Sequence, residues 1–153
     1  MSDATNYAEN QLIDTLFRGG SGNWYVGLLT AITAAETGAV TEVASAGGYA
    51  RVAIPKTTDA WAGTQGAGTT GASSGTSGQT SNNAAITFPA PTTDWAPASA
   101  PLVGLGLWDA PAGGNLWFVH QLTNSSGTVV SRTVLAGDDP PFFAPSALTM
   151  TLA

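Results

Sequence analysis

Residues 103–122, VGLGLWDAPAGGNLWFVHQL, contain the pattern that decides the fold. Two short apolar runs flank a connection, residues 109–114, in which a proline and two glycines disfavour a continuous helix. Short runs rich in aromatic and aliphatic side chains are typical of strands. The stretch therefore predicts a β-hairpin at the middle of a sheet.

The second strand of this hairpin carries apolar side chains on both faces. Alternation along the strand places Leu116, Phe118 and Leu122 on one face, and Trp117 and Val119 on the other. A strand of this kind is at least partly covered on both sides. We therefore expect a central strand of a β-sandwich or of a sheet assembled from several subunits.

Further short strands, separated by turns rich in proline and glycine, are expected on either side of the hairpin. They are predicted at residues 23–30, 49–54, 84–88, 129–135 and 147–152, with a weaker candidate at 40–43. Many short strands and one initial helix predict an all-β fold, a β-sandwich or jelly-roll-like domain. Residues 1–153 are interpreted as a single domain.

One amphipathic helix is expected within residues 1–20, spanning residues 3–18 with Ser2 or Asp3 as its N-cap. Its apolar stripe consists of Leu12, Ile13, Leu16 and Phe17. Because a short helix is not stable alone in water, this stripe must pack on another surface. The surface is either the domain itself or a neighbouring subunit, so these four side chains are candidates for partner contact.

Residues 56–83 are predicted to form a long Gly/Ser/Thr-rich arm. Such a segment cannot build its own core, and a connection of this length is either functional or an idle insertion. Trp61 is the unusual residue in it, because an isolated tryptophan requires a pocket in its own chain or in a neighbour. Trp61 is therefore the fifth candidate for partner contact.

The composition excludes several classes of partner. The 153 residues carry ten acidic and four basic side chains, a net charge of −6, and no cysteine. Binding to nucleic acid or to an anionic membrane surface requires clustered Lys and Arg, which are lacking. No apolar run approaches the ~20 residues of a membrane span, and the N-terminus lacks a signal-peptide pattern. We expect a protein that is made and left in a cytoplasm.

Candidate catalytic and metal-binding residues are few. His120 is the only histidine, and a hydrolase triad would need a nucleophile and a carboxylate around it. Asp138 and Asp139 are adjacent, but Ca²⁺ requires six to eight oxygen ligands, which favours a solvated turn over a calcium site. Asp109 is interpreted as a turn residue. The sequence predicts no enzyme activity and no cofactor.

Several segments occur together in an order that identifies a family. They read NYAENQLIDTLFRG, WYVGLLT, GGYARVAI, NNAAITFP, VGLGLWDAPAGGNLWFVHQL and ALTMTL. The chain resembles, over nearly its whole length, small virion proteins of tailed bacteriophages that are usually labelled tail fibre or tail-fibre-like. The resemblance implies a short helix followed by an all-β domain.

The resemblance also implies a non-enzymatic structural protein of the virion, assembled in the cytoplasm of the host bacterium. Its place would be the surface of the head or tail, as a decoration, cement or fibre-like subunit. Its partners would be copies of itself and other virion proteins, such as the major capsid or tail proteins. The alternative is a carbohydrate-binding module that recognises host surface glycans, which the five tryptophans favour because aromatic faces stack on sugars.

Overall fold

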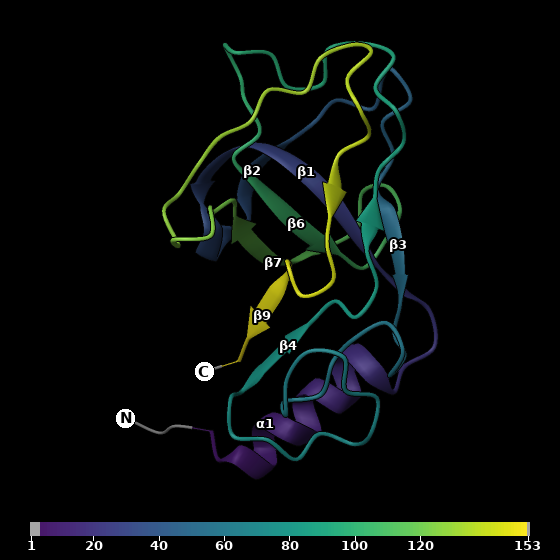
Figure 1. The fold of residues 1–153 in the computed structure, drawn as a ribbon, viewed down its shortest axis with the longest axis vertical. Coiled ribbons are helices and arrows are strands. Elements are labelled where there is room, and N and C mark those ends of the chain that lie inside the picture. Colours follow the sequence, from purple (N-terminus) through teal and green to yellow (C-terminus); the bar gives the residue numbers. More distant parts are fainter. Residues whose placement is uncertain (1–3, 153) are drawn as a thin grey trace. The chain divides into compact units, whose positions relative to one another are not determined.

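The computed structural model describes residues 4–152 and divides the chain into two compact units. The helix unit comprises Met1–Trp24, Ile54–Ile86 and Phe143–Ala153, and the sheet unit comprises Tyr25–Ala53 and Thr87–Phe142. Antiparallel strands and one short helix confirm the all-β class (Figure 1). The sandwich or jelly-roll arrangement and the single-domain organisation stay predictions.

The largest sheet has five strands and is built mostly from the sheet unit. Its order is β2-β1-β6-β7, with β3 paired to β1 (Figure 1). The strands are β1 (Asn23–Ala34), β2 (Ala39–Glu42), β3 (Val52–Pro55), β6 (Gly104–Trp108) and β7 (Leu116–Gln121). Strand β6 is antiparallel to both of its neighbours, β1 and β7.

The predicted hairpin is confirmed as β6 and β7, with Leu105 opposite His120. Every residue of β6 is buried, as expected of a central strand. Strand β7, in contrast, is the last strand in this order, and its side chains are exposed or half-buried. Of the two hairpin strands, only β6 is therefore central, because β7 lies at the end of this strand order among the described residues.

Two glycines explain how β6 accommodates a tryptophan at its end. Gly27 of β1 lies opposite Gly106 of β6. A Cβ atom at Gly106 would lie 2.3 Å from the Trp108 ring, and one at Gly27 would lie 2.7 Å from it. These contacts are too short for any side chain, so the missing Cβ atoms leave the space that the Trp108 ring occupies.

The remaining strand predictions have mixed outcomes. The prediction at residues 129–135 is wrong, because this segment makes only isolated bridges to Thr123, Leu102 and Ala96 instead of following one partner strand. Four further short strands form two separate two-stranded pairs. Strand β4 (Gln79–Ser81) pairs with β9 (Thr149–Thr151), and β5 (Ile86–Thr87) pairs with β8 (Phe142–Phe143).

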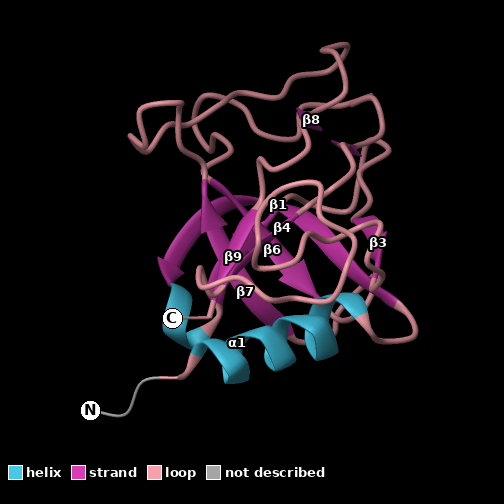
Figure 2. Cartoon of the chain, turned by 60° about the horizontal axis from the view of Figure 1, so that its bottom comes forward, coloured by secondary structure: helices cyan, strands magenta, loops and turns pink. Residues whose placement is uncertain are grey.

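The helical segment begins at Asn6, later than predicted, and ends at the predicted Arg18. Helix α1 (Asn6–Ile13) continues directly into a π-helical turn, Asp14–Arg18 (Figure 2). Thr5 is the N-cap, and its side chain accepts a hydrogen bond from the Ala8 amide at 3.3 Å. Ser2 and Asp3, the expected caps, lie outside the described residues.

Residues 56–83 belong to the helix unit; both ends of the segment contain buried residues, whereas most of residues 65–77 are exposed, and the arm that the sequence predicts stays a prediction. The segment contains β4, and its Thr64, Thr80 and Asn82 side chains are buried. Trp61 is 0% exposed and packs on Phe17, with 4.9 Å between ring centroids. The tryptophan therefore finds its pocket within its own chain.

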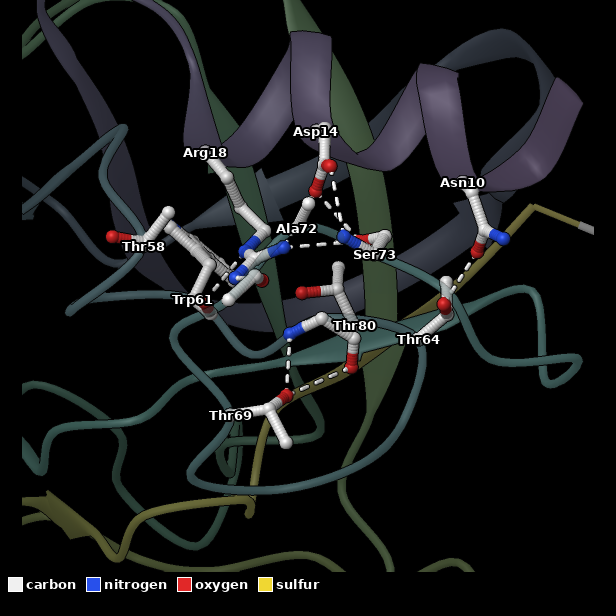
Figure 3. Close-up of polar contacts among 12 residues, drawn as sticks. Asn10, Asp14, Arg18, Thr58, Trp61, Thr64, Thr69, Ala72, Ser73 and Thr80 are labelled. Atoms are coloured by element: carbon white, nitrogen blue, oxygen red, sulfur yellow. Dashed lines mark hydrogen bonds and ion pairs between the residues drawn. The ribbon is translucent and has the colours of Figure 1, made fainter. Parts of the chain in front are cut away.

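Hydrogen bonds to the helix also order this segment, as Figure 3 shows. Arg18 donates from Nε to the Trp61 carbonyl at 3.0 Å and from its guanidinium to the Gly71 carbonyl at 2.5 Å. Asp14 accepts from the Ser73 amide at 2.9 Å and from its hydroxyl at 2.6 Å. The helix thus anchors the glycine-rich loop through an acid and a base one turn apart.

Candidate binding groove beside strand β7

A groove of about 720 Å³ opens in the sheet unit beside strand β7. One wall is the connection between β1 and β2, which includes the 3-10 turn Ala35–Thr37. The lining also includes the start of β7 with the preceding residues, Gly114 and Asn115. A groove of this volume lies within the range of ordinary ligand sites.

Trp117 is the most exposed large apolar side chain of this groove, with 49% of its surface accessible. Its indole Nε1 donates a hydrogen bond to Asp109 Oδ2 at 3.1 Å. A buried tryptophan would hide its rings, and an unrestrained surface tryptophan would sample several rotamers. Here the hydrogen bond fixes the orientation of an exposed aromatic side chain.

Asp109 holds both ends of the hairpin turn. Its carboxylate accepts from the Asn115 amide at 2.7 Å and from Asn115 Nδ2 at 2.8 Å, in addition to the Trp117 indole. The hydrogen bonds from the Asn115 side chain, its backbone and Trp117 lower the pKa of Asp109 to about 2. The group is therefore charged at neutral pH, and its role as a turn residue agrees with the sequence interpretation.

Gly114 is required for this arrangement. Its φ is +72°, in the left-handed region that favours glycine, and a Cβ atom would lie 2.5 Å from Asp109 Oδ1. Gly113 has a similar φ of +60°, but a Cβ atom there would meet nothing within 4 Å. Only Gly114 is thus held by close contact with the carboxylate that orients Trp117.

Arg51 also holds the turn before β7. Its Nη1 donates to the carbonyls of Ala110 and Gly113, both at 2.8 Å. Its Nε and Nη2 donate to the two oxygens of Glu42 at 2.8 and 2.7 Å, and its guanidinium lies 3.9 Å from the centre of the Trp108 ring. This two-pronged ion pair fixes the guanidinium, and through it the turn.

Tyr49 completes the support around Glu42. Its hydroxyl donates to Glu42 Oε1 at 2.8 Å and accepts from the Leu28 amide at 2.8 Å. Burial, above all, raises the pKa of the Tyr49 hydroxyl, which therefore stays protonated and keeps its donor role. The turn before β7 thus rests on a chain of hydrogen bonds that reaches into β1.

The candidates for partner contact that the sequence identified lie elsewhere, in the helix unit. Ile13 and Phe17 are fully buried, as is Trp61. Leu12 is 46% exposed and Leu16 is half-buried. The structure therefore divides the predicted stripe into two side chains that face the interior and two that reach the surface.

Sequence reasoning missed the groove, although a signal for it was present. Of the five tryptophans, only Trp117 is exposed. The spacing of Asp109, Asn115 and Trp117 around two glycines indicates a turn whose acid can reach a tryptophan. Trp117 itself lies in β7, directly after this turn.

The other candidates take structural positions. Asp138 accepts from the Leu135 amide at 2.8 Å, as in the predicted turn, and His120 lies half-buried in β7. Within residues 4–152, no three His, Cys, Asp or Glu side chains group as metal ligands would. Over the same range, no helix has the length and apolar character needed to cross a bilayer.

Comparison with known proteins identifies the family. A family model described as podophage GP4 fiber I protein gp80 matches residues 3–151. No curated protein matches the chain with significance. The match covers the helix, both units and the hairpin, and it confirms the resemblance to phage fibre proteins. The chain therefore belongs to the podophage GP4 fiber I protein gp80 family and is a structural protein of a phage virion.

Proposed function

We propose that the chain is a non-enzymatic surface subunit of a phage particle that acts through contacts with copies of itself and with other virion proteins. The family description favours a fibre-like role over capsid decoration. The observation that carries the proposal is Leu12, an apolar side chain left 46% exposed on α1 while Ile13 beside it is buried. Leu16 is one turn away on the same side, so the two form a small apolar ridge.

Exposed apolar side chains are also found beyond this ridge. The large ones are Tyr7, Trp117, Val129, Leu135 and Phe142. Single exposed apolar residues are normal on a soluble surface, so their number alone proves nothing. The low charge of the chain supports their role in an interface. Only 9% of residues are charged, and the cores of protein interfaces are depleted in charge.

The basic side chains strengthen this argument. Of the four, Arg18 and Arg51 are held by internal ion pairs, and Lys56 lies over the Trp24 ring at 4.1 Å. Arg132 is exposed. Few cations must therefore lose their hydration when the surface meets another protein, which lowers the cost of association.

The test is the substitution Leu12→Glu, with Gln11→Glu as the matched control. Both variants add one negative charge to an exposed position of α1, and neither changes a buried side chain. We expect Leu12→Glu to fold normally but to be depleted from assembled particles by at least about tenfold. Gln11→Glu should be incorporated like the parent.

Two results would contradict the proposal. Normal incorporation of Leu12→Glu would show that the ridge contacts no partner. Equal loss in both variants would show that added charge on the helix, and not the apolar contact, disturbs assembly. Light scattering of the purified variants would report self-association separately from incorporation into particles.

A further inference from the structure

We propose that residues 129–135 of the sheet unit form an open edge on which a second copy of this chain adds the same segment as an antiparallel strand. This inference rests on the proposed function and deepens it, because it names one surface through which copies of the chain meet. Three features of the open edge support it: backbone groups that face outward without a partner, a register in which the segment complements itself, and the absence of acidic side chains.

Alternate residues of the open edge hold it to the sheet unit through their backbone groups. The inward hydrogen bonds run from the amides of Val130, Arg132 and Val134 to the carbonyls of Leu122, Leu102 and Ala96, at 2.9, 3.0 and 2.9 Å. The carbonyls of Arg132 and Val134 accept in return from the amides of Leu102 and Ala96, at 2.7 and 3.0 Å. The segment is therefore extended and paired along one side, although it changes partner at each step.

The residues between these, Val129, Ser131 and Thr133, direct their amides and carbonyls to the opposite side, because backbone direction alternates along an extended chain. Within residues 4–152 these groups make no hydrogen bond. Val129 is 55% exposed, and Ser131 and Thr133 are exposed as well. A row of exposed and unpaired amides and carbonyls is a template for an added strand.

The open edge complements itself in one antiparallel register. When Ser131 lies opposite Ser131 of the second copy, Val129 of each copy lies opposite Thr133 of the other. Each of these pairs can exchange two hydrogen bonds, because all three residues present both backbone groups outward. Valine and threonine side chains also pair favourably across antiparallel strands. The occupant that fits this edge is therefore a second copy of the same segment.

Two neighbouring registers are disfavoured. A pairing centred on Arg132 would place two like charges directly opposite each other, which destabilises an antiparallel pair. A pairing centred on Thr133 would need the backbone groups of Leu135, which already bond to the Asp138 carboxylate and amide at 2.8 and 3.1 Å. The pairing centred on Ser131 avoids both conflicts, because it places Arg132 opposite Val130.

The charge of the chain limits where two copies can meet. Each copy has a net charge of −6, so surfaces that carry carboxylates repel one another. The chain has ten acidic residues, yet residues 110–137 contain neither aspartate nor glutamate. Two copies can therefore pair along the open edge without placing acidic side chains opposite each other.

Cysteine substitutions test the register, because the chain itself contains no cysteine. In the proposed pair the two Ser131 Cα atoms lie ~5.5 Å apart, a spacing that a disulfide can span. Ser131→Cys should therefore form covalent dimers in an oxidised glutathione buffer, as seen by non-reducing electrophoresis. Thr133→Cys is the matched control, because the two substituted residues would lie four positions out of register, ~13 Å apart along the strands. It should cross-link at least about tenfold more slowly.

A proline substitution tests the hydrogen bonds. Ser131→Pro removes one outward amide and keeps the inward hydrogen bonds of the open edge. Analytical ultracentrifugation of the parent should show a weak dimer with a Kd on the order of 0.1 mM, and Ser131→Pro should weaken it at least about tenfold. Ser125→Pro is the matched control. Ser125 is the second residue of a turn that the Gly127 amide closes on the Asn124 carbonyl, a position that favours proline, so its dimer should equal that of the parent.

Three results would overturn the proposal. They are a strictly monomeric parent at ~1 mM, equal dimerisation of Ser131→Pro and the parent, or equal cross-linking of the two cysteine variants. Melting curves establish that each variant is folded. Leu12→Glu separates this proposal from the function on which it rests. A monomeric parent whose incorporation still depends on Leu12 overturns only the open edge, and a dimeric parent whose Leu12→Glu variant is incorporated normally overturns only the ridge.

Discussion

Replacing Arg18 by methionine tests how the glycine-rich segment 56–83 is held. The side chain is 1% exposed and makes four hydrogen bonds. Two of these bonds reach the carbonyls of Trp61 and Gly71, and two reach Ser73 Oγ and Asp14 Oδ1. Methionine keeps most of the apolar stem and removes the guanidinium, so the substitution isolates the polar contribution.

The expected loss of unfolding free energy is about 3 kcal/mol. Removing one partner of a fully buried ion pair costs ~3–5 kcal/mol, because the other charge is left without compensation. Asp14 is 30% exposed and keeps its two hydrogen bonds from Ser73, which places the loss at the lower end. The Trp61 carbonyl adds to it, since its hydrogen bond from Arg18 is buried.

The assay is urea denaturation followed by tryptophan fluorescence, combined with hydrogen exchange of residues 69–75. For a chain of this length, the loss corresponds to a decrease in Tm of about 6–12 °C. Exchange in the loop should accelerate before the rest of the chain is affected, because its backbone anchors are lost first. Arg132→Met is the matched control, as Arg132 is exposed, and should stay within ~0.5 kcal/mol of the parent.

The reasoning is refuted if Arg18→Met unfolds within ~0.5 kcal/mol of the parent and its loop exchange is unchanged. The order of this loop would then depend on contacts other than the guanidinium. A large loss in Arg132→Met as well would indicate a general effect of removing positive charge from a chain with a net charge of −6.

The remaining two predictions concern Asp14 and the turn before β7. Burial raises the pKa of Asp14, but hydrogen bonds from Ser73 and Arg18 outweigh it, so the pKa lies below 3.8. The stability that the charged Asp14 carboxylate contributes is thus complete above pH 3.8 and is lost as the pH falls through the folded-state pKa. Urea titrations from about pH 5 to pH 2 should therefore show less acid destabilisation in Asp14→Asn than in the parent. The same pH profile in both proteins would contradict this prediction. Gly114→Ala should cost at least ~1 kcal/mol more than Gly113→Ala, because only the former adds a clash with Asp109 to the left-handed backbone, and equal denaturation curves would refute that role.

The hairpin and the first strand were predictable because their signals are local. Strand β6 and strand β7 lie within residues 103–122, and β1 begins at the predicted Asn23. Apolar density, turn residues and strand length all indicate the same structure there. The predicted strand at 129–135 shows the limit, because its sequence permits pairing but cannot choose one partner among Thr123, Leu102 and Ala96.

The order of residues 56–83 was not predictable from their own composition. Glycine, serine and threonine bury little apolar area, which made an exposed arm the natural expectation. The order comes instead from Asp14 and Arg18 on the helix turn, more than 50 residues away from Gly71 and Ser73 in the chain. The sequence showed the two charges as a helix pair, and only the structure shows that they also bind the loop.

The two units share one device, a buried arginine that orders a loop with few apolar side chains. Arg18 donates to the carbonyls of Trp61 and Gly71, and Arg51 donates to those of Ala110 and Gly113. Each arginine is paired with an acid, so its charge is compensated while its remaining donors reach backbone carbonyls.

This use of arginine explains how loops rich in glycine and poor in apolar side chains are ordered. A glycine-rich loop loses much entropy when it folds, and it has little apolar surface to offset that loss. One planar guanidinium fixes several carbonyls at once, and lysine, with a compact charge, cannot reproduce this geometry. Two of the four basic residues are held in internal ion pairs in this way. The surface is therefore acidic and poor in cations. The property that orders the loops thus also shapes the surface on which the virion contacts are proposed.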